Sequence, residues 1–454
     1  MAASVFDSPL YAQLFPTGDT GRLFSDSAAL RAMLLVEGAL AKAQGQAGII
    51  PEISAAAIQR ASLEIQIDPG AIARRTGQNG VCVPGLIAAF RGEMNAPEHA
   101  QYVHWGATSQ DVIDTGLMLR LRQALALAET DLKTLLKTLG QNAEEYADTP
   151  MAARTYGQFA TPTTWGAVLA QWGHPLADAL EALQGVRQGS LWVSLSGAAG
   201  TASALGPEPS ALRAALAEGL GLNDPRRSWH TDRGPILRIT DWMAGVTTGL
   251  GAMGTTLLDL SASGVEEVAF EATGHSSTMP QKQNPVQASS LVALSQQSAA
   301  LRSGLATAGV HQHQRDGAAW FTEWMLVPQM ALTTAAALQT ANALALSLRP
   351  APSRMAAALQ DNLGLVYAEA LSFALASRMP RAEAQELAKT LCAAATAQQT
   401  PLLKLAKADH PDLPDSLFET HAQLGQAPAD ARAFAKRAEA LLRCALPSYS
   451  FCLR

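Results

Sequence analysis

The segment 115–148 constrains the fold more than any other part of the chain, because it contains no proline and repeats apolar residues at helical spacing. These residues recur at steps of three and four: Leu117, Leu121, Ala124, Ala128, Leu132, Leu135, Leu136 and Leu139. The spacing places them on one face of a helix. At about 1.5 Å per residue this helix is roughly 45–50 Å long, several times the usual length. Such a face must be buried against other long helices.

Further segments with the same patterning predict four more long helices: 163–188, 236–263, 285–307 and 318–348. No convincing run of alternating β-branched residues bounded by turns predicts a strand. Long helices with short connections indicate an all-α fold built on an elongated central bundle. Shorter helical patterns broken by proline and glycine flank the bundle. We therefore expect three domains: an N-terminal helical domain at 1–111, the bundle at 112–350 and a small helical C-terminal domain at 351–454.

The composition limits the partners of this bundle. With 48% apolar and 16% charged residues, the chain can fill a large core and is not disordered. Its 33 Lys and Arg against 39 Asp and Glu give a net charge of −6, so we expect no nucleic acid and no membrane as partner. So few charges also favour burial of surface between subunits. An anionic substrate then requires a local group of cations.

The sequence predicts neither export nor membrane insertion. The first residues lack a basic region followed by a continuous apolar run. The tempting apolar segment 323–349 is interrupted by proline and polar residues, so we interpret it as a buried bundle helix. The cysteines form no metal-binding or redox spacing: they are Cys82, Cys392, Cys444 and Cys452. We therefore expect a reduced, cytoplasmic protein.

Two short motifs match the sequence patterns of ligand sites but lack the structural context that such sites require. Residues 249–254 read GLGAMG, the GxGxxG pattern of dinucleotide-binding turns, but they lie inside a helical pattern without the strand that such a turn requires. We interpret Gly245 and Gly249 as places where neighbouring helices approach closely. His311 and His313 form an HxH pair with no third ligand nearby, which favours a structural role. We expect no cofactor and no metal.

The segment 274–285, GHSSTMPQKQNP, carries the most informative chemistry. It predicts a polar loop that enters through a glycine, and Asn284 and Pro285 can begin the next helix as its cap and first residue. A serine takes a proton from carbon only if backbone amides and a nearby cation stabilise its alkoxide. Lys282 can supply that cation while the loop closes and excludes water. The loop is therefore a candidate for proton transfer at carbon.

Three segments resemble the fumarase/aspartase superfamily, and the resemblance extends over most of the chain. They are the SSxMPxKxNP pattern of the loop, residues 104–111 (HWGATSQD) and residues 154–164 (RTYGQFATPTT). The resemblance implies a homotetramer whose long helices form a central bundle, with each active site built from three subunits. It implies that Ser276 is the catalytic serine. It also implies substrate contacts by Lys282, Asn284, Thr108, Ser109, Thr155 and Gln158.

Tyr156 departs from the superfamily, which mostly has the histidine of RTHGQ at this position. That histidine is linked to proton transfer at the leaving group, and a tyrosine with an ordinary pKa of about 10 cannot replace it as a poised acid-base. A carboxylate leaving group needs no such proton, since it is the conjugate base of an acid of pKa about 4. Adding a carboxylate across a double bond closes a lactone. The muconate cycloisomerase branch of the superfamily catalyses this reaction, and its histidine is replaced.

Other segments resemble that branch more than any lyase: 194–201 (SLSGAAGT), 229–233 (WHTDR) and 314–324 (QRDGAAWFTEW). The adenylosuccinate lyases usually carry a phosphate-binding arginine at the position of Trp324, which counts against a nucleotide substrate. The branch usually has an aspartate at Gly234 and a glycine at His275. These two departures bear on which substrate is bound more than on the class of reaction. The resemblance implies a cofactor-free cycloisomerase of aromatic catabolism that acts on a small polycarboxylate.

The expected roles follow from this chemistry. Ser276 is expected to transfer the proton at the carbon next to a carboxylate, in both directions of the reaction. Lys282, Arg315 and His104 are expected to neutralise the three substrate carboxylates. The residues expected to orient these carboxylates are Thr108, Ser109 and Asn284. Tyr156 is expected to line the pocket or to hydrogen-bond the carboxylate that closes the ring.

Other interpretations stay open. Arg315 can instead be a structural arginine that pairs with Asp316 or Glu323, and His104 can simply cap a loop. A second enzyme interpretation is a lyase of the same superfamily that eliminates another poor base, such as nitrite, from a succinyl compound. A third is a catalytically silent relative kept as a structural protein, which Tyr156 alone supports.

Overall fold

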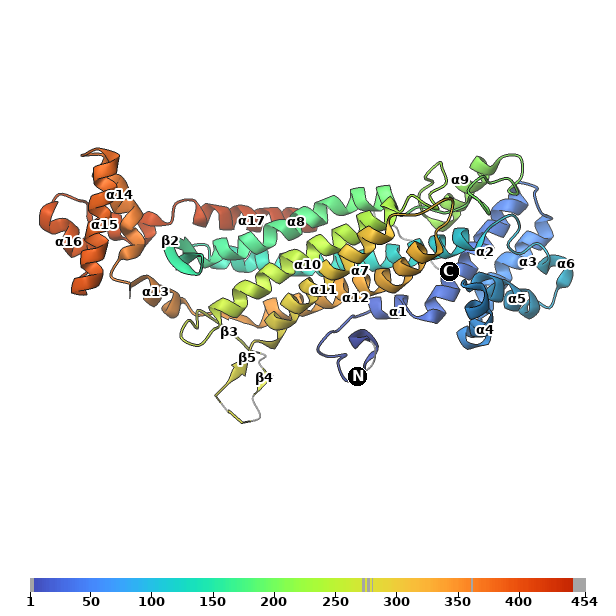
Figure 1. Ribbon diagram of the computed structural model, residues 1–454, viewed down its shortest axis with the longest axis horizontal. Coiled ribbons are helices and arrows are strands. Elements are labelled where there is room, and N and C mark those ends of the chain that lie inside the picture. Colours follow the sequence, from blue (N-terminus) through green and yellow to red (C-terminus); the bar gives the residue numbers. More distant parts are fainter. Residues whose placement is uncertain (1–3, 272–273, 276–277, 280, 361, 444–454) are drawn as a thin grey trace. The chain divides into compact units, whose positions relative to one another are not determined.

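The computed structural model describes residues 4–271, 274–275, 278–279, 281–360 and 362–443, and helices make up most of this chain (Figure 1). The all-α class is therefore confirmed. The long helices expected from the sequence are also confirmed, and they are α7 (Ser109–Glu145), α8 (Trp165–Ser190), α10 (Gly234–Leu260), α11 (Val286–Ala308) and α12 (Gly317–Ser347).

The predicted apolar face of α7 is buried. Its leucines are at most 6% exposed: Leu117, Leu121, Leu132, Leu135, Leu136 and Leu139. Each fully buried leucine contributes about 2 kcal/mol relative to an exposed one, so this face is a main source of stability. The helix begins at Ser109, earlier than the apolar pattern alone predicts. The polar HWGATSQD segment therefore leads directly into the first turn of the longest helix.

The chain divides into two compact units. Unit 1 comprises Met1–Asp131, Glu181–Thr248 and Ala293–Thr340. Besides parts of the long helices it contains α1 (Thr20–Leu23), α2 (Asp26–Gln46), α3 (Glu52–Glu64), α4 (Pro69–Asn79), α5 (Val83–Glu93), α6 (Pro97–Ala100) and α9 (Pro209–Leu220). Within this unit Thr247 of α10 donates to Ser298 of α11 at 2.7 Å, which joins two long helices by a buried hydrogen bond.

Unit 2 comprises Leu132–Leu180, Gly249–Val292 and Ala341–Arg454. Its helices outside the bundle are α13 (Pro352–Gln360), α14 (Ala368–Ala376), α15 (Arg381–Gln398), α16 (Leu402–Asp409) and α17 (Ala427–Arg443). The described helices α14, α15 and α16 share a small core built on Leu371, Leu391 and Leu402. The division into domains at 1–111, 112–350 and 351–454 stays a prediction.

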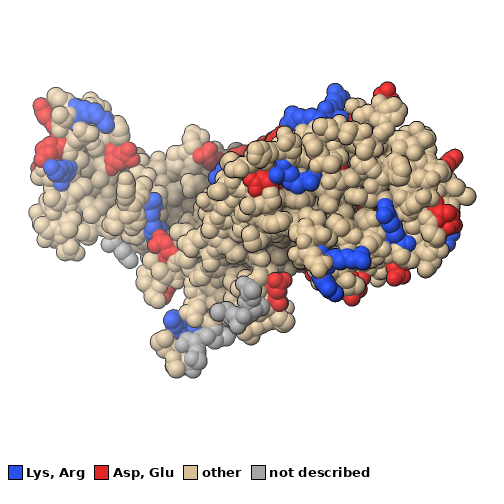
Figure 2. All heavy atoms as spheres, turned by 45° about the vertical axis from the view of Figure 1, so that its right-hand side comes forward, with Lys and Arg blue, Asp and Glu red and all other residues tan. Residues whose placement is uncertain are grey.

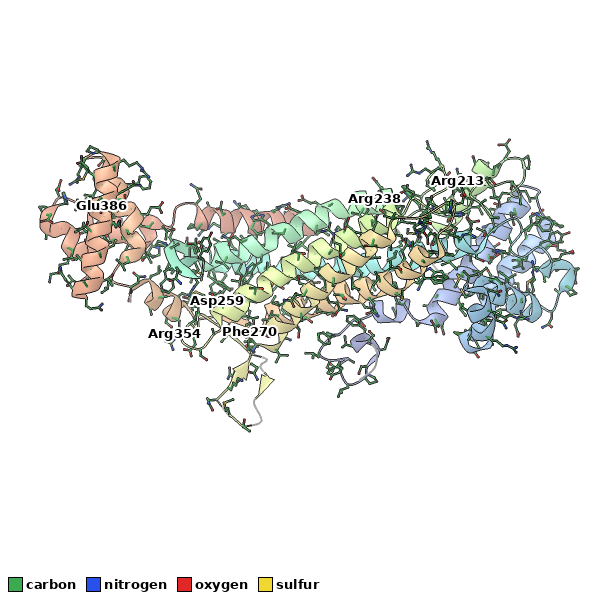
Figure 3. All side chains as sticks on the ribbon, viewed as in Figure 1. Arg213, Arg238, Asp259, Phe270, Arg354 and Glu386 are labelled. Carbon is green, nitrogen blue, oxygen red and sulfur yellow. The ribbon has the colours of Figure 1, made fainter. Side chains whose placement is uncertain are left out.

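Unit 2 also contains short antiparallel strand pairs that the sequence patterns did not reveal. They are β1 (Pro150–Thr155) with β2 (Gln158–Thr164), β3 (Val268–Phe270) with β6 (Leu348–Pro350), and β4 (Gly274–His275) with β5 (Gln283–Asn284). The strands β3, β4, β5 and β6 have only two or three residues each, too few for an alternating pattern. Beside β3, Glu266 forms an ion pair with Arg354 of α13; Arg354 and Phe270 are labelled in Figure 3.

The GLGAMG motif lies inside α10, as expected, and its glycines allow close helix packing. A Cβ on Gly254 would lie 2.8 Å from the Ala288 carbonyl oxygen of α11, and one on Gly249 would lie 3.3 Å from Leu176 of α8. The expectation for Gly245 is wrong, because within the described chain no neighbouring helix comes within 4 Å of its hypothetical Cβ. The close approach therefore falls on the motif itself.

Charged side chains are sparse on the face of the molecule in Figure 2, where uncharged atoms cover most of the surface. This agrees with the low charged fraction of 16%. Several large apolar side chains are exposed in the single chain, including Trp105 at 44% and Met325 at 64%. Among the described residues, no helix is both long enough and apolar enough to cross a membrane.

Candidate active site

A tight turn carries the first residues of the HWGATSQD segment, 104–108, into the start of α7. His104 and Gly106 have φ values of +63° and +73°, and a Cβ on Gly106 would lie 2.3 Å from the Ala204 carbonyl oxygen. Only glycine fits at this point, since any side chain would collide with backbone. Gln44 of α2 donates to the Trp105 carbonyl at 2.7 Å. The turn is thus fixed from two sides.

His104 forms a short contact with a buried acid. Its Nδ1 lies 2.6 Å from Oε1 of Glu37, a residue of α2 whose side chain is 1% exposed. Burial lowers the pKa of His104, but the charge and the hydrogen bond of Glu37 raise it more, so the pKa lies above its ordinary value. The contact with Glu37 therefore favours the protonated form of the imidazole.

Asp111 connects the start of α7 to the loop at 194–200. Its carboxylate accepts from the backbone amides of Thr108 at 3.1 Å, Ser196 at 2.9 Å and Gly197 at 2.9 Å. It also contacts Nε2 of His230 at 2.9 Å. Because Asp111 is 1% exposed, these contacts fix the first turn of α7 and the loop to each other.

Arg315 reaches the same helix start. Its Nε donates to Gln110 Oε1 at 2.8 Å, and its Nη2 donates to Thr108 Oγ1 at 3.3 Å and to the Ala198 carbonyl at 3.1 Å. Within the described chain, Arg315 forms no ion pair with a carboxylate, and Glu323 pairs instead with Arg233. A guanidinium and a hydroxyl at a helix N-terminus form a site for an anion.

Thr108 and Ser109 lie at the same helix start. Ser109 is the first residue of α7, and both residues are half-buried. The first backbone N–H groups of a helix have no partner within the helix, and the helix dipole favours negative charge there. Unit 1 therefore brings together four of the predicted site residues near the start of α7: His104, Thr108, Ser109 and Arg315.

Two further histidines and an arginine near this site are buried beside carboxylates, which is typical of structural residues. Arg233 is 1% exposed and donates to Asp114 at 2.8 Å, and His230 is 2% exposed beside Asp111. The His311 side chain is fully buried, with Nε2 3.7 Å from Glu323. In the described part of the chain, no cluster of His, Cys, Asp and Glu could hold a metal ion.

The β1–β2 hairpin of unit 2 carries a second group of predicted residues. Thr155 and Gln158 are the last paired positions, and Tyr156 lies at the tip with φ +52° and a fully exposed side chain. The sequence analysis did not identify what holds this hairpin. Arg154 forms two hydrogen bonds with the buried carboxylate of Glu267, at 2.8 and 2.9 Å, and its Nε lies 3.9 Å from Asp259, labelled in Figure 3.

The loop at 274–285 is closed at its base by the β4–β5 pair, in which Gly274 pairs with Asn284. Lys282 is exposed and its backbone amide donates to the Met279 carbonyl at 3.0 Å. Asn284 is half-buried and lies two residues before α11 begins. The predicted catalytic residue Ser276 lies outside the described residues. Unit 2 thus contains Thr155, Tyr156, Gln158, Lys282 and Asn284, the remaining described members of the predicted site.

The fold and these motifs define a class. Residues 18–298 match the lyase family. The chain therefore belongs to this family, within the fumarase/aspartase superfamily that its motifs resemble.

Among its relatives is the 3-carboxy-cis,cis-muconate cycloisomerase of Pseudomonas aeruginosa. The two chains are 38% identical over 398 residues, and these residues cover 87% of each chain. This chain is 33% identical over 398 residues to the nitrosuccinate lyase of Streptomyces davaonensis, covering 85% of this chain and 84% of that protein. The crystal structure of the 3-carboxy-cis,cis-muconate lactonizing enzyme from Pseudomonas putida is similar with a TM-score of 0.88 and 34% identity, covering 96% of this chain and 100% of that one.

Proposed function

We propose that the protein catalyses the reversible lactonisation of 3-carboxy-cis,cis-muconate to 4-carboxymuconolactone, a step of protocatechuate catabolism through the β-ketoadipate pathway. The observation that carries this proposal is the 38% identity to a cycloisomerase across 87% of both chains. Tyr156 supports the same reaction, because a carboxylate that adds or leaves needs no proton from the position where lyases have histidine.

The chemical step requires one proton at carbon. A substrate carboxylate oxygen forms a bond to one carbon of a double bond, and the electron pair of that double bond takes a proton onto the neighbouring carbon. Ser276 donates this proton during lactonisation and removes it in the reverse direction. Lys282 stabilises the serine alkoxide that remains, as an exposed cation on the same loop.

The substrate carboxylates require cations beyond Lys282. Arg315 supplies one, supported by its contacts to Thr108 and Gln110 and by its lack of an ion pair in the described chain. His104 supplies another, supported by its contact with Glu37. Thr108, Ser109 and Asn284 orient the carboxylates, and Thr155 and Gln158 contact the substrate from the hairpin.

The active protein is proposed to be a cytoplasmic homotetramer whose active sites each combine residues of three subunits. Tyr156 supports this assembly. A residue that lines a substrate pocket needs neighbours, yet this side chain is 105% exposed in the single chain. Apolar side chains exposed on α12, Phe321 at 41% and Met325 at 64%, also favour burial between subunits.

The decisive experiment incubates the purified protein with 3-carboxy-cis,cis-muconate and follows the loss of diene absorbance. We expect loss of absorbance with the native protein and a large decrease in rate with Ser276→Ala. Near-full turnover by Ser276→Ala contradicts the role of Ser276. No reaction by the native protein, with fumarate-type additions also absent, favours a catalytically silent relative.

A second candidate is elimination of nitrite from nitrosuccinate. The 33% identity to a nitrosuccinate lyase favours it, and nitrite is also a poor base that leaves without a proton. Release of nitrite from nitrosuccinate, compared with the rate of lactonisation under the same conditions, distinguishes the two. We expect lactonisation to be faster.

A further inference from the structure

Glu37 is a buried acid outside every motif that identifies the family. It lies within α2, its side chain is 1% exposed, and its Oε1 lies 2.6 Å from Nδ1 of His104. Among the described residues, no hydrogen-bond donor reaches its other oxygen, Oε2. A buried carboxylate with one unpaired oxygen is costly unless a positive charge compensates it. His104 is the group in contact with it that can carry such a charge.

The contact decides which hydrogen-bonding groups His104 offers. An ionised carboxylate only accepts hydrogen bonds, so Nδ1 of His104 carries a proton in either charge state. In the neutral ring Nε2 has a lone pair, which repels a substrate carboxylate. In the imidazolium Nε2–H is a donor with a positive charge, which attracts one. His104 can therefore bind a carboxylate only in its protonated form.

The other charged groups that act on the ring come from separate helices. Asp111 of α7 raises the pKa of His104, as Glu37 does, whereas burial and Arg91 of α5 lower it. Asp111 is already occupied by its backbone contacts, so Glu37 is the acid in direct contact with the ring. Removal of its charge leaves burial as the main influence, which favours the neutral ring.

The position of the ring is fixed by the same helix. The backbone of His104 is in the left-handed region, with φ +63°, and Gln44 of α2 holds the next residue through the Trp105 carbonyl. Glu37 and Gln44 are both 1% exposed. One acts on the ring and the other on the backbone, which allows the two effects to be tested separately.

We propose that Glu37 is a positioning residue that keeps His104 as an imidazolium with Nε2–H directed to a substrate carboxylate. The proposal rests on the proposed function, because it gives His104 a polycarboxylate to bind. It also makes α2 part of the selection for an anionic substrate, through a residue that does not touch the substrate itself.

The first test measures the ring and needs no substrate. In protein labelled with 13Cε1-histidine, the His104 resonance is assigned by its loss in His104→Gln and then titrated. We expect Glu37→Gln to lower the pKa of His104 below that of the native protein, and Glu37→Asp, which keeps the charge, to retain a raised pKa. Gln44→Leu is the matched control for the turn and should not lower it. Equal titration of Glu37→Gln and the native protein overturns the proposal.

The second test measures the reaction. At pH 7.5, Glu37→Gln should raise KM for the tricarboxylate roughly 10- to 100-fold, the effect of losing one hydrogen bond between charged groups. The value of kcat should change less than about threefold, because the proton transfer at carbon is untouched. Lowering the pH should restore KM in Glu37→Gln, and Glu37→Asp should restore it in part. A fall in kcat alone, without a change in KM, contradicts the proposal even if the lactonising activity is confirmed.

Discussion

Arg233 and Glu323 face each other in the interior of the protein, joined by two hydrogen bonds of 2.8 Å (Nε to Oε1) and 2.7 Å (Nη2 to Oε2). A third hydrogen bond joins Arg233 Nη1 to Asp114, at 2.8 Å. Burial lowers the pKa of Arg233, but Asp114 and Glu323 raise it more, so the guanidinium stays charged. This arrangement ties α7 and α12 to Arg233, the residue before α10.

Glu323→Gln should destabilise the protein by about 3–5 kcal/mol, because it leaves the buried guanidinium of Arg233 with one carboxylate. The free energy of unfolding is measured by urea denaturation. Glu386→Gln is the matched control, since Glu386 is exposed on α15 and should change stability by less than about 0.5 kcal/mol. Equal stability of the two variants contradicts the structural role of the pair.

Arg315→Lys should raise KM roughly tenfold, because lysine keeps the charge but cannot contact Gln110, Thr108 and the Ala198 carbonyl together. Steady-state kinetics with the diene substrate provide the measurement. Arg302→Lys makes the same exchange at an exposed pair with Asp241 and should leave KM unchanged. If both variants behave alike, Arg315 does not hold the substrate.

Tyr156→Ala should lower turnover but leave the free energy of unfolding within about 0.5 kcal/mol of the native value, since the side chain is fully exposed. Comparing kinetics with chemical denaturation separates the two effects. The variant Tyr156→His tests whether lactonisation requires a tyrosine at this position. If it leaves lactonisation intact, tyrosine is permitted at the tip but not required.

The contact between Glu37 and His104 should make stability depend on pH. The pKa of His104 in the folded protein is raised above 6.5, so the folded state binds this proton more tightly than the unfolded state. The stabilisation is therefore complete below pH 6.5 and is lost as the pH rises through the folded pKa. Denaturation midpoints at several pH values should fall across this range more steeply for the native protein than for His104→Gln. Parallel curves contradict the prediction.

Gly173 and Gly185 of α8 should respond oppositely to alanine. A Cβ on Gly173 would lie 1.9 Å from the ring of the fully buried Phe434 of α17, so Gly173→Ala should destabilise by about 1–3 kcal/mol. Among the described residues, no atom outside the local helix backbone lies within 4 Å of a Cβ on Gly185, so Gly185→Ala should be neutral or stabilising by up to about 1 kcal/mol. Thermal denaturation of both variants gives the comparison.

The features that the sequence predicts well are repeated or local. The long helices follow from apolar residues at helical spacing, and the polar segment 104–111 does lead into the first turn of one of them. The helix after the 274–285 loop, α11, begins at Val286, one residue after the start at 285 that the sequence predicts.

The features that the sequence does not predict are pairings between distant positions. Glu37 contacts a histidine 67 positions away, Gln110 contacts Arg315 across 205 positions, and Arg154 contacts Glu267 across 113. Each is an ordinary polar residue until the chain folds, and no spacing rule connects it to its partner. Arg315, whose alternative interpretation was a structural pair with Asp316 or Glu323, contacts Gln110 and Thr108 at the start of α7.

The tip of the β1–β2 hairpin has a consequence for how such proteins diversify. The side chain of Tyr156 is fully exposed and does not pack within its own chain. Arg154 anchors the hairpin through Glu267, two residues before Tyr156. A replacement there is therefore almost free of folding cost, although the positive φ favours some residues over others. Under the proposed function, the residue at this tip can therefore change the reaction without a change in the fold that carries it.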